Sequence, residues 1–266
     1  MSQNSPLSLR RPGDPPEAIL FIRSFLFWIG FFLSTIFFAI TALLLYPFSF
    51  KVRYTYITQW ARLNLAWLWI TCRLKGRVEG VEHIPAQPGV ILAKHQSTWE
   101  TLALQRIFPM QAWVLKRELL RIPFFGWGLA LMDPIAIDRG AGRKAVEQVV
   151  EQGQQRLAAK RWVVIFPEGT RIAPGERGRY RVGGALLAER AGVPVVPMAH
   201  NAGEFWPRHG FIKRPGIITV RLGPPIEPEG KSAQEILHQA EEWIEATMTE
   251  ITTRPDLYDA ARDDNP

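Results

Sequence analysis

A histidine and an acidic residue stand five positions apart where a short apolar run ends. His95 directly follows the run GVILAK at residues 89–94, and Glu100 comes five residues later. A carboxylate that accepts the proton of one imidazole nitrogen leaves the other nitrogen free to take a proton from a substrate. The two residues therefore have the types and spacing of a general base and the carboxylate that orients it.

The same stretch also has a purely structural interpretation. Ser97 followed by Glu100 matches a capping box, in which the two side chains satisfy backbone N–H groups at the start of a helix. The positive end of such a helix disfavours a charged imidazole, whereas Glu100 favours one. These residues alone do not decide between a helix cap and a catalytic pair.

A second candidate for chemistry is the segment FPEGTR at residues 166–171, which also ends an apolar run. Gly169 permits close approach of the backbone, and the guanidinium of Arg171 can bind a phosphate through two parallel hydrogen bonds. An ordinary turn with a surface arginine explains the same residues. No serine or cysteine nucleophile is needed if an acceptor substrate supplies the hydroxyl.

Short apolar runs alternate with helical stretches after residue 77. The runs are rich in β-branched residues and bordered by turn residues, which predicts strands. They cover residues 89–94, 111–116, 133–137, 162–166, 193–199 and 217–222. Helices are expected at residues 97–108, 142–160, 182–191 and 232–252. This alternation predicts an α/β fold with a largely parallel or mixed sheet flanked by helices, in which His95 lies at the carboxyl end of a strand, where ligands bind.

The N-terminal region contains a segment suited to a membrane. Residues 24–46 carry no charge, and as a helix they would extend about 35 Å, enough to cross a bilayer. Basic residues flank both ends, so the positive-inside rule does not distinguish a spanning helix from a re-entrant or in-plane one. Residues 54–72 contain three tryptophans, which favour an interfacial helix over a core helix. We predict a hydrophobic membrane-attachment helix pair.

Charge and cysteine content support this division of the chain. The predicted parts are an arm with membrane-anchoring helices (1–77), a catalytic domain (78–254) and a polar tail (255–266). The net charge of +7 lies entirely in residues 1–77, which have nine Lys and Arg against two acidic residues. This distribution suits anionic lipids better than nucleic acid. The single cysteine, Cys72, excludes an intrachain disulfide and fits a cytoplasmic catalytic face.

Four blocks of the sequence resemble, in order, the motifs of the 1-acylglycerol-3-phosphate O-acyltransferases, a membrane-bound family of phospholipid synthesis. The blocks are KHQSTWE (94–100), KRELLRIPFFGW (116–127), FPEGTR (166–171) and VPVVP (193–197). One position departs from the family pattern, because the first family motif ends in Asp where this chain has Glu100. The substitution lengthens the side chain by one methylene and keeps its charge.

The resemblance implies that an acyl group passes from acyl-CoA or acyl-carrier protein to the sn-2 hydroxyl of 1-acylglycerol-3-phosphate (lysophosphatidic acid), giving phosphatidic acid. His95 would deprotonate the hydroxyl and Glu100 would orient His95. The residues implied around the phosphate and glycerol of the acceptor are Lys116, Arg139, Glu168, Gly169, Thr170 and Arg171. No cofactor is expected beyond the thioester co-substrate, and the remaining histidines show no metal-ligand spacing.

Other interpretations stay open at this level. The chain could be an acyltransferase of the same fold with another lysolipid acceptor, a membrane-bound hydrolase in which His95 activates water, or a lipid-binding scaffold. Residues 122–127 suit either an acyl pocket or core packing. Arg117, Arg177, Arg179 and Arg181 suit lipid headgroups, acyl carrier protein or solvent. We expect a bacterial-type inner membrane location, with the catalytic domain facing the cytoplasm.

Overall fold

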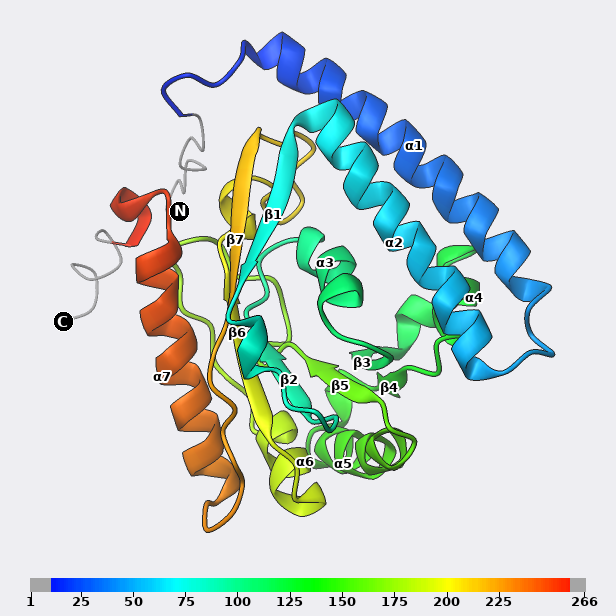
Figure 1. Cartoon of the computed structure of the whole chain (residues 1–266), viewed down its shortest axis with the longest axis vertical. Helices are drawn as coiled ribbons and strands as arrows, with labels where there is room; N and C mark the ends of the chain where they lie inside the picture. The colour runs from blue at the N-terminus through cyan, green and yellow to red at the C-terminus, as the bar shows by residue number, and fades with distance from the viewer. Residues whose placement is uncertain (1–10, 259–266) are drawn as a thin grey trace.

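A seven-stranded sheet with helices on both faces forms the centre of the molecule (Figure 1). The computed structural model describes residues 11–258, with the exception of the Arg139 side chain. The strands are β1 Leu74–Glu79, β2 Val90–Ala93, β3 Gln111–Lys116, β4 Ile135–Ile137, β5 Trp162–Ile165, β6 Val195–His200 and β7 Gly216–Leu222. The α-helices are α1 Glu17–Leu43, α2 Phe50–Cys72, α3 Trp99–Ile107, α4 Phe125–Ala130, α5 Arg143–Ala158, α6 Gly183–Ala191 and α7 Ala233–Ile251. Short 3₁₀ turns are η1 Val81–His83, η2 Arg117–Arg121, η3 Arg139–Ala141 and η4 Ala202–Glu204.

The sheet is mixed, with strand order β1-β7-β6-β2-β5-β3-β4. Only β6 and β7 pair antiparallel, and every other neighbouring pair is parallel. The five parallel strands β6, β2, β5, β3 and β4 therefore end at one common edge, where ligands bind in open α/β sheets. This arrangement confirms the predicted fold class.

Alternate residues of each central strand enter two separate cores. On β2, Val90 and Leu92 face the core that contains α5, α6 and α7, whereas Ile91 and Ala93 face the core that contains α2 and α3. This alternation follows from the two-residue period of a strand. The four buried positions explain why β2 reads as an uninterrupted apolar run.

The six predicted strands, the three helices predicted between them and the predicted final helix are present, with small shifts at their ends. Strand β1 was not predicted, because its sequence LKGRVE is mostly polar and exposed at the sheet edge, where it pairs with β7. It extends across residue 77, where the sequence analysis placed the end of the N-terminal arm. The final helix, α7, begins with a capping box formed by Ser232 and Glu235.

Helices α1 and α2 form a hairpin that lies diagonally across the α3 side of the sheet (Figure 1). Asn64 of α2 donates to Ser34 of α1 at 3.0 Å. The indole of Trp67 donates to the Leu26 carbonyl at 3.2 Å. These contacts hold α1 against α2, and α1 also contacts α4 directly, so the two predicted N-terminal helices are part of one packed structure.

The outer side of α1 is not covered by any other described part of the chain. Among the described residues, α1 is the one helix long and apolar enough to cross a membrane. Its exposed side chains include Phe21, Phe25, Leu33 and Phe37, each at least half exposed. A continuous apolar surface of this kind marks a site of interaction with lipid or another protein.

Candidate active site

His95 lies one residue beyond Lys94 at the carboxyl edge of the sheet, between the ends of β2 and β5. Its ring stacks on Phe166, the residue after β5, with ring centres 3.9 Å apart and planes at 13°. The backbone N–H of Ile172 donates to the His95 carbonyl at 2.8 Å. The two candidate segments of the sequence are therefore adjacent, and the second segment holds the imidazole of the first.

The predicted histidine and carboxylate are in contact. His95 Nδ1 lies 2.8 Å from Glu100 Oε1, and the same oxygen accepts the N–H groups of Ser97 at 2.8 Å and Gln96 at 3.0 Å. A carboxylate can only accept, so Nδ1 carries the proton in this contact and Nε2 is left as the basic nitrogen. Glu100 thus satisfies backbone amides and orients the histidine at once, which combines the two interpretations of the sequence.

Glu100 is held as a carboxylate. Complete burial raises its pKa, but His200, His95 and the Ser97 N–H act in the opposite direction, and the net pKa lies below the usual value. The longer Glu side chain reaches the imidazole from the first turn of α3. The departure from the family Asp therefore still gives a direct hydrogen bond to His95.

Glu168 of the FPEGTR segment lies behind His95. Its Oε2 accepts the His95 backbone N–H at 2.8 Å, and its Oε1 lies 2.8 Å from Lys94 Nζ. Lys94 Nζ also donates to Glu245 of α7 at 2.8 Å. Burial raises the pKa of Glu168 to about 7, against the opposing effect of Lys94. The geometry gives Glu168 a part in fixing the His95 backbone, and its predicted contact with the acceptor stays a prediction.

The rest of that segment turns toward solvent and then back to the cavity beside His95. Gly169 has φ 68°, a left-handed conformation that favours glycine, and its N–H donates to the Phe166 carbonyl at 3.0 Å. Thr170 is exposed. Arg171 is partly buried and lines the cavity together with His95. Burial lowers the pKa of Arg171, and the nearby Glu100 opposes this change.

The two other predicted phosphate ligands follow β3 and β4 at the same edge of the sheet. Lys116 is the last residue of β3 and is exposed, next to Leu115, which lines the cavity. Arg139 begins η3 directly after β4, and its side chain lies outside the described part of the structure. Strand order alone therefore brings Lys116 and the backbone of Arg139 to the edge that carries His95.

An apolar cavity of about 310 Å³ extends from His95 between the helix hairpin and α4. Phe31 and Phe38 of α1 and Trp60 of α2 form one side. Phe125 and Leu129 of α4 contribute to the other. The polar residues among its lining are Thr35, His95, Thr98, Thr101, Gln105 and Arg171. An apolar cavity with few polar groups at a reactive histidine suits a hydrocarbon chain whose reacting end is polar.

Residues 122–127 were predicted either to line an acyl pocket or to pack in the core, and only some of them line the cavity. Phe124 and Phe125 line the cavity, whereas Ile122 and Trp127 are more than two-fifths exposed. Helices α1 and α2 were not predicted as cavity walls, because their apolar residues also fit membrane attachment. The role of Lys94 was not predicted either, since a lysine within an apolar run gives no sequence signal that it will pair with Glu245, 151 positions away.

Comparison with known proteins agrees with this geometry. A family model described as Acyltransferase matches residues 75–201. The 1-acyl-sn-glycerol-3-phosphate acyltransferase of Pseudomonas aeruginosa is 44% identical over 240 residues, covering 87% of this chain and 92% of that protein. The protein of the same name in Saccharomyces cerevisiae is 30% identical over 210 residues, covering 72% of this chain and 69% of that protein.

The fold also has a counterpart among solved structures. The crystal structure of the 1-acyl-sn-glycerophosphate acyltransferase from Thermotoga maritima aligns with a TM-score of 0.74 at 21% identity, covering 90% of this chain and 98% of that chain. The likeness includes most of the described chain and supports the fold. With the identity and coverage of the bacterial relative, the resemblance seen in the four motif blocks is confirmed: the chain belongs to the 1-acyl-sn-glycerol-3-phosphate acyltransferase family.

Proposed function

We propose that this protein transfers a fatty acyl group from a thioester to the sn-2 hydroxyl of 1-acylglycerol-3-phosphate, giving phosphatidic acid. One observation carries the proposal: His95, hydrogen-bonded to Glu100, lies at the wall of an apolar cavity that Arg171 also lines. A base beside a cation and a hydrocarbon-sized cavity matches an acceptor that has a hydroxyl, a phosphate and one acyl chain. The names of the relatives support this acceptor over other lysolipids.

The reaction needs only the two substrates and this chain. His95 Nε2 takes the proton of the acceptor hydroxyl, and the oxygen attacks the thioester carbonyl carbon to form a tetrahedral oxyanion. Collapse of the oxyanion breaks the C–S bond, and the imidazolium returns its proton to the departing sulfur. The products are phosphatidic acid and a free thiol, without a metal or other cofactor. Glu100 stabilises the imidazolium between the two proton transfers.

The cations at the carboxyl edge of the sheet bind the phosphate of the acceptor. Arg171 is the central one, because its Nε is buried and has no hydrogen-bond partner within the described residues, while the side chain lines the cavity. Lys116 and Arg139 would complete the charge around a dianionic phosphate. Gly169 and Thr170 shape the loop that carries Arg171.

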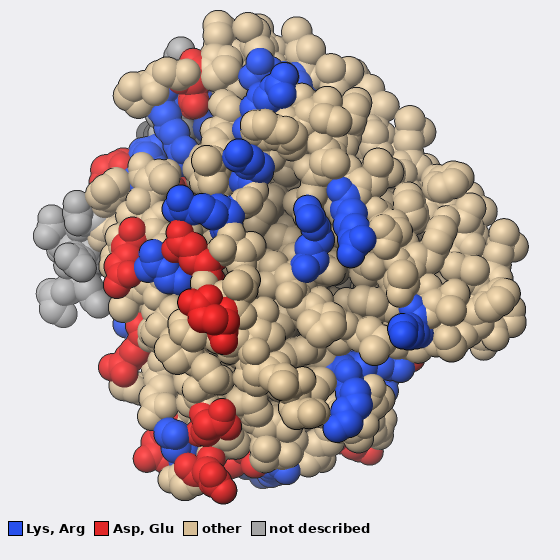
Figure 2. Space-filling model, in the orientation of Figure 1, with Lys and Arg blue, Asp and Glu red and all other residues tan. Residues whose placement is uncertain are grey.

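We place the enzyme on a membrane through the apolar outer side of α1. In the face drawn in Figure 2, the upper right-hand edge, where the C-terminal part of α1 lies, shows no charged side chains, and Asp and Glu gather toward the opposite side. The basic excess of the N-terminal region suits anionic headgroups. We propose a bacterial-type inner membrane with the catalytic domain facing the cytoplasm, where coenzyme A or acyl carrier protein would deliver the acyl group.

The test is turnover by the purified full-length protein in lipid–detergent micelles. The unchanged enzyme should make phosphatidic acid from 1-oleoyl-glycerol-3-phosphate and either palmitoyl-CoA or palmitoyl-acyl carrier protein. His95→Ala should lower kcat by about 10² to 10⁴-fold, the usual contribution of a general base. His238→Ala is the matched control, because His238 is an exposed histidine that also contacts a glutamate, Glu242.

Three outcomes would contradict the proposal. Normal turnover by folded His95→Ala protein would remove the base. Release of free fatty acid without phosphatidic acid would indicate a hydrolase. Acylation of another lysolipid with no product from lysophosphatidic acid would assign a different acceptor.

A further inference from the structure

A second histidine, His200, is completely buried beside the catalytic pair. It is the last residue of β6, next to β2 in the sheet, and lies outside the four motif blocks. Its ring therefore approaches the end of β2 from the neighbouring strand. A fully buried histidine near a reactive centre needs a hydrogen-bond partner for each ring nitrogen.

The hydrogen bonds of His200 define its protonation. The Ala202 backbone N–H donates to His200 Nδ1 at 3.2 Å, so Nδ1 is an acceptor without a proton. His200 Nε2 lies 2.8 Å from the Lys94 carbonyl oxygen, which can only accept. The proton must then be on Nε2, and the ring is a neutral imidazole whose N–H points toward the end of β2.

The same N–H lies near the catalytic carboxylate. His200 Nε2 is 4.0 Å from Glu100 Oε2, and this oxygen is buried without a hydrogen-bond partner in the described residues. The other oxygen, Oε1, receives His95 and two backbone amides. The His200 ring thus faces Oε2, the oxygen of Glu100 that has no hydrogen-bond partner within the described residues.

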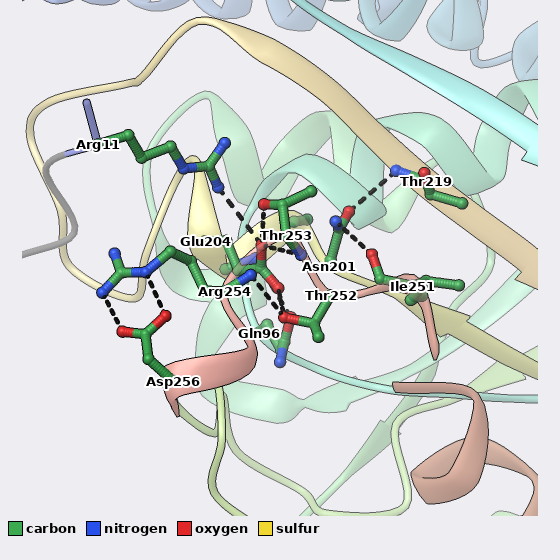
Figure 3. Close-up of polar contacts among 12 residues, drawn as sticks. Arg11, Gln96, Asn201, Glu204, Thr219, Ile251, Thr252, Thr253, Arg254 and Asp256 are labelled. Carbon is green, nitrogen blue, oxygen red and sulfur yellow. Dashed lines mark hydrogen bonds and ion pairs between the residues drawn. The ribbon is translucent and has the colours of Figure 1, made fainter. Parts of the chain in front are cut away.

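The segment that follows His200 forms hydrogen bonds with two other parts of the fold (Figure 3). Asn201 donates to the Ile251 carbonyl at 2.9 Å and accepts the Thr219 N–H at 2.9 Å. Glu204, three residues after Asn201, accepts hydrogen bonds from Thr252 and Thr253. Contacts to β7 and to the end of α7 therefore fix the backbone that carries His200.

We propose that His200 is a positioning residue for acyl transfer. It holds the Lys94 carbonyl, and with it the backbone of His95, and it places an N–H beside the free oxygen of Glu100. The proposal rests on the function proposed above, since it assigns His200 to the same reaction. The catalytic group is His95, and His200 acts through its neighbours.

Three ionisable groups face His200. Glu100 approaches from α3, and His95 and Lys94 approach from the end of β2. The Lys94 ammonium is directed away, toward Glu168 and Glu245. Burial lowers the pKa of His200 while Glu100 opposes this effect, and the net direction is downward. The ring therefore remains neutral where Glu100 is ionised, which is the state the hydrogen bonds require.

Two substitutions separate the two hydrogen bonds of His200. A glutamine amide nitrogen reaches about as far as Nε2, so His200→Gln keeps a donor for the Lys94 carbonyl. An asparagine oxygen reaches about as far as Nδ1, so His200→Asn keeps only the acceptor for Ala202. We expect His200→Asn to lower kcat about 10- to 100-fold, the scale of outer hydrogen-bonding partners of a reactive group. His200→Gln should recover most of that loss, and KM for lysophosphatidic acid should change little in both.

The pH profile separates positioning from a purely structural role. In the unchanged protein the His200 N–H partly offsets the negative charge of Glu100. Without this N–H, the carboxylate stabilises a proton on His95 more strongly. The acidic limb of the kcat/KM profile should therefore move to higher pH in His200→Asn and stay in place in His200→Gln. His83→Gln is the matched control. His83 Nδ1 lies 2.9 Å from the Leu222 carbonyl oxygen, with which it forms a hydrogen bond, and His83 does not line the cavity.

The assays use the donor that supports turnover by the unchanged enzyme, after thermal unfolding has shown that each variant is folded. Equal kcat and an unshifted acidic limb in folded His200→Asn would overturn the proposal. Equal losses in the Asn and Gln variants would also overturn it, since the donor would then be irrelevant. If the unchanged enzyme makes no phosphatidic acid, the proposed function itself is wrong, which is a separate result.

Discussion

Two lysines are buried among the described residues, and their surroundings differ. Lys94, at the catalytic edge, lies 2.8 Å from a carboxylate oxygen of Glu168 and 2.8 Å from one of Glu245. Lys213, at the junction with α1, has no carboxylate partner within the described residues. Its Nζ lies 3.6 Å from the centre of the Trp28 ring and donates to the Phe211 carbonyl at 2.7 Å.

The difference shows two ways to keep a charge inside a protein. Two carboxylates compensate the desolvation of Lys94, and one of them also accepts the His95 N–H. Aromatic faces compensate Lys213 only in part, and burial lowers the pKa of Lys213 to about 7. The buried lysine of the catalytic edge is therefore paired with carboxylates, whereas the α1 junction contains a cation that has no carboxylate partner in the described part of the chain and can lose its proton.

The largest expected effect is the loss of charge at Glu100. In Glu100→Gln the amide can donate to Nδ1 and favour the wrong tautomer of His95, so kcat should fall about 10³- to 10⁴-fold, as when a catalytic histidine loses its orienting carboxylate. Phosphatidic acid formation under saturating substrates measures this. Glu242→Gln is the control, because Glu242 pairs with the exposed His238. Turnover of folded Glu100→Gln close to that of the control would show that the charge is not required.

Removal of the paired lysine should mainly affect stability. Lys94→Met leaves Glu168 and Glu245 next to each other without a cation, and breaking a buried pair in this way costs about 3 to 5 kcal/mol of unfolding free energy. Denaturant unfolding followed by tryptophan fluorescence checks the value. Lys75→Met on the exposed edge strand should change it little. Equal stability of the two variants would mean that the pairing of Lys94 contributes nothing.

The unpaired lysine should appear as a smaller, pH-dependent effect. Between pH 7 and the ordinary lysine pKa of 10.5, the unfolded chain holds a proton that the folded Lys213 has released. The free energy of unfolding should therefore rise with pH in this range, by about 2 to 3 kcal/mol from pH 7 to 9.5.

Lys213→Met lacks this titration, so the difference in stability between the unchanged protein and the variant should grow in favour of the unchanged protein as pH increases. Parallel stability curves for the two proteins would show that Lys213 titrates normally. Lys231→Met, on an exposed loop, should leave the slope unchanged.

Much of the fold could be predicted from local patterns. The buried strands read as apolar runs and the helices as periodic segments, because each pattern is set by neighbours in the sequence. Strand β1 was missed, because an exposed edge strand has little apolar content and its pairing with β7 joins residues far apart in the chain. The contact between His95 and Glu100 was predictable for the same reason as the strands, since five positions separate them.

The sequence by itself determined the family resemblance, the close spacing of His95 and Glu100, and the order of six of the seven strands. Tertiary structure decided what surrounds that pair: Glu168 at the His95 backbone, Glu245 on Lys94, His200 beside Glu100, and α1 and α2 as cavity walls. The physical reason is the range of the interactions. Turns, caps and periodic faces depend on adjacent residues, whereas the compensation of a buried charge and the closure of a cavity depend on which distant segments pack together.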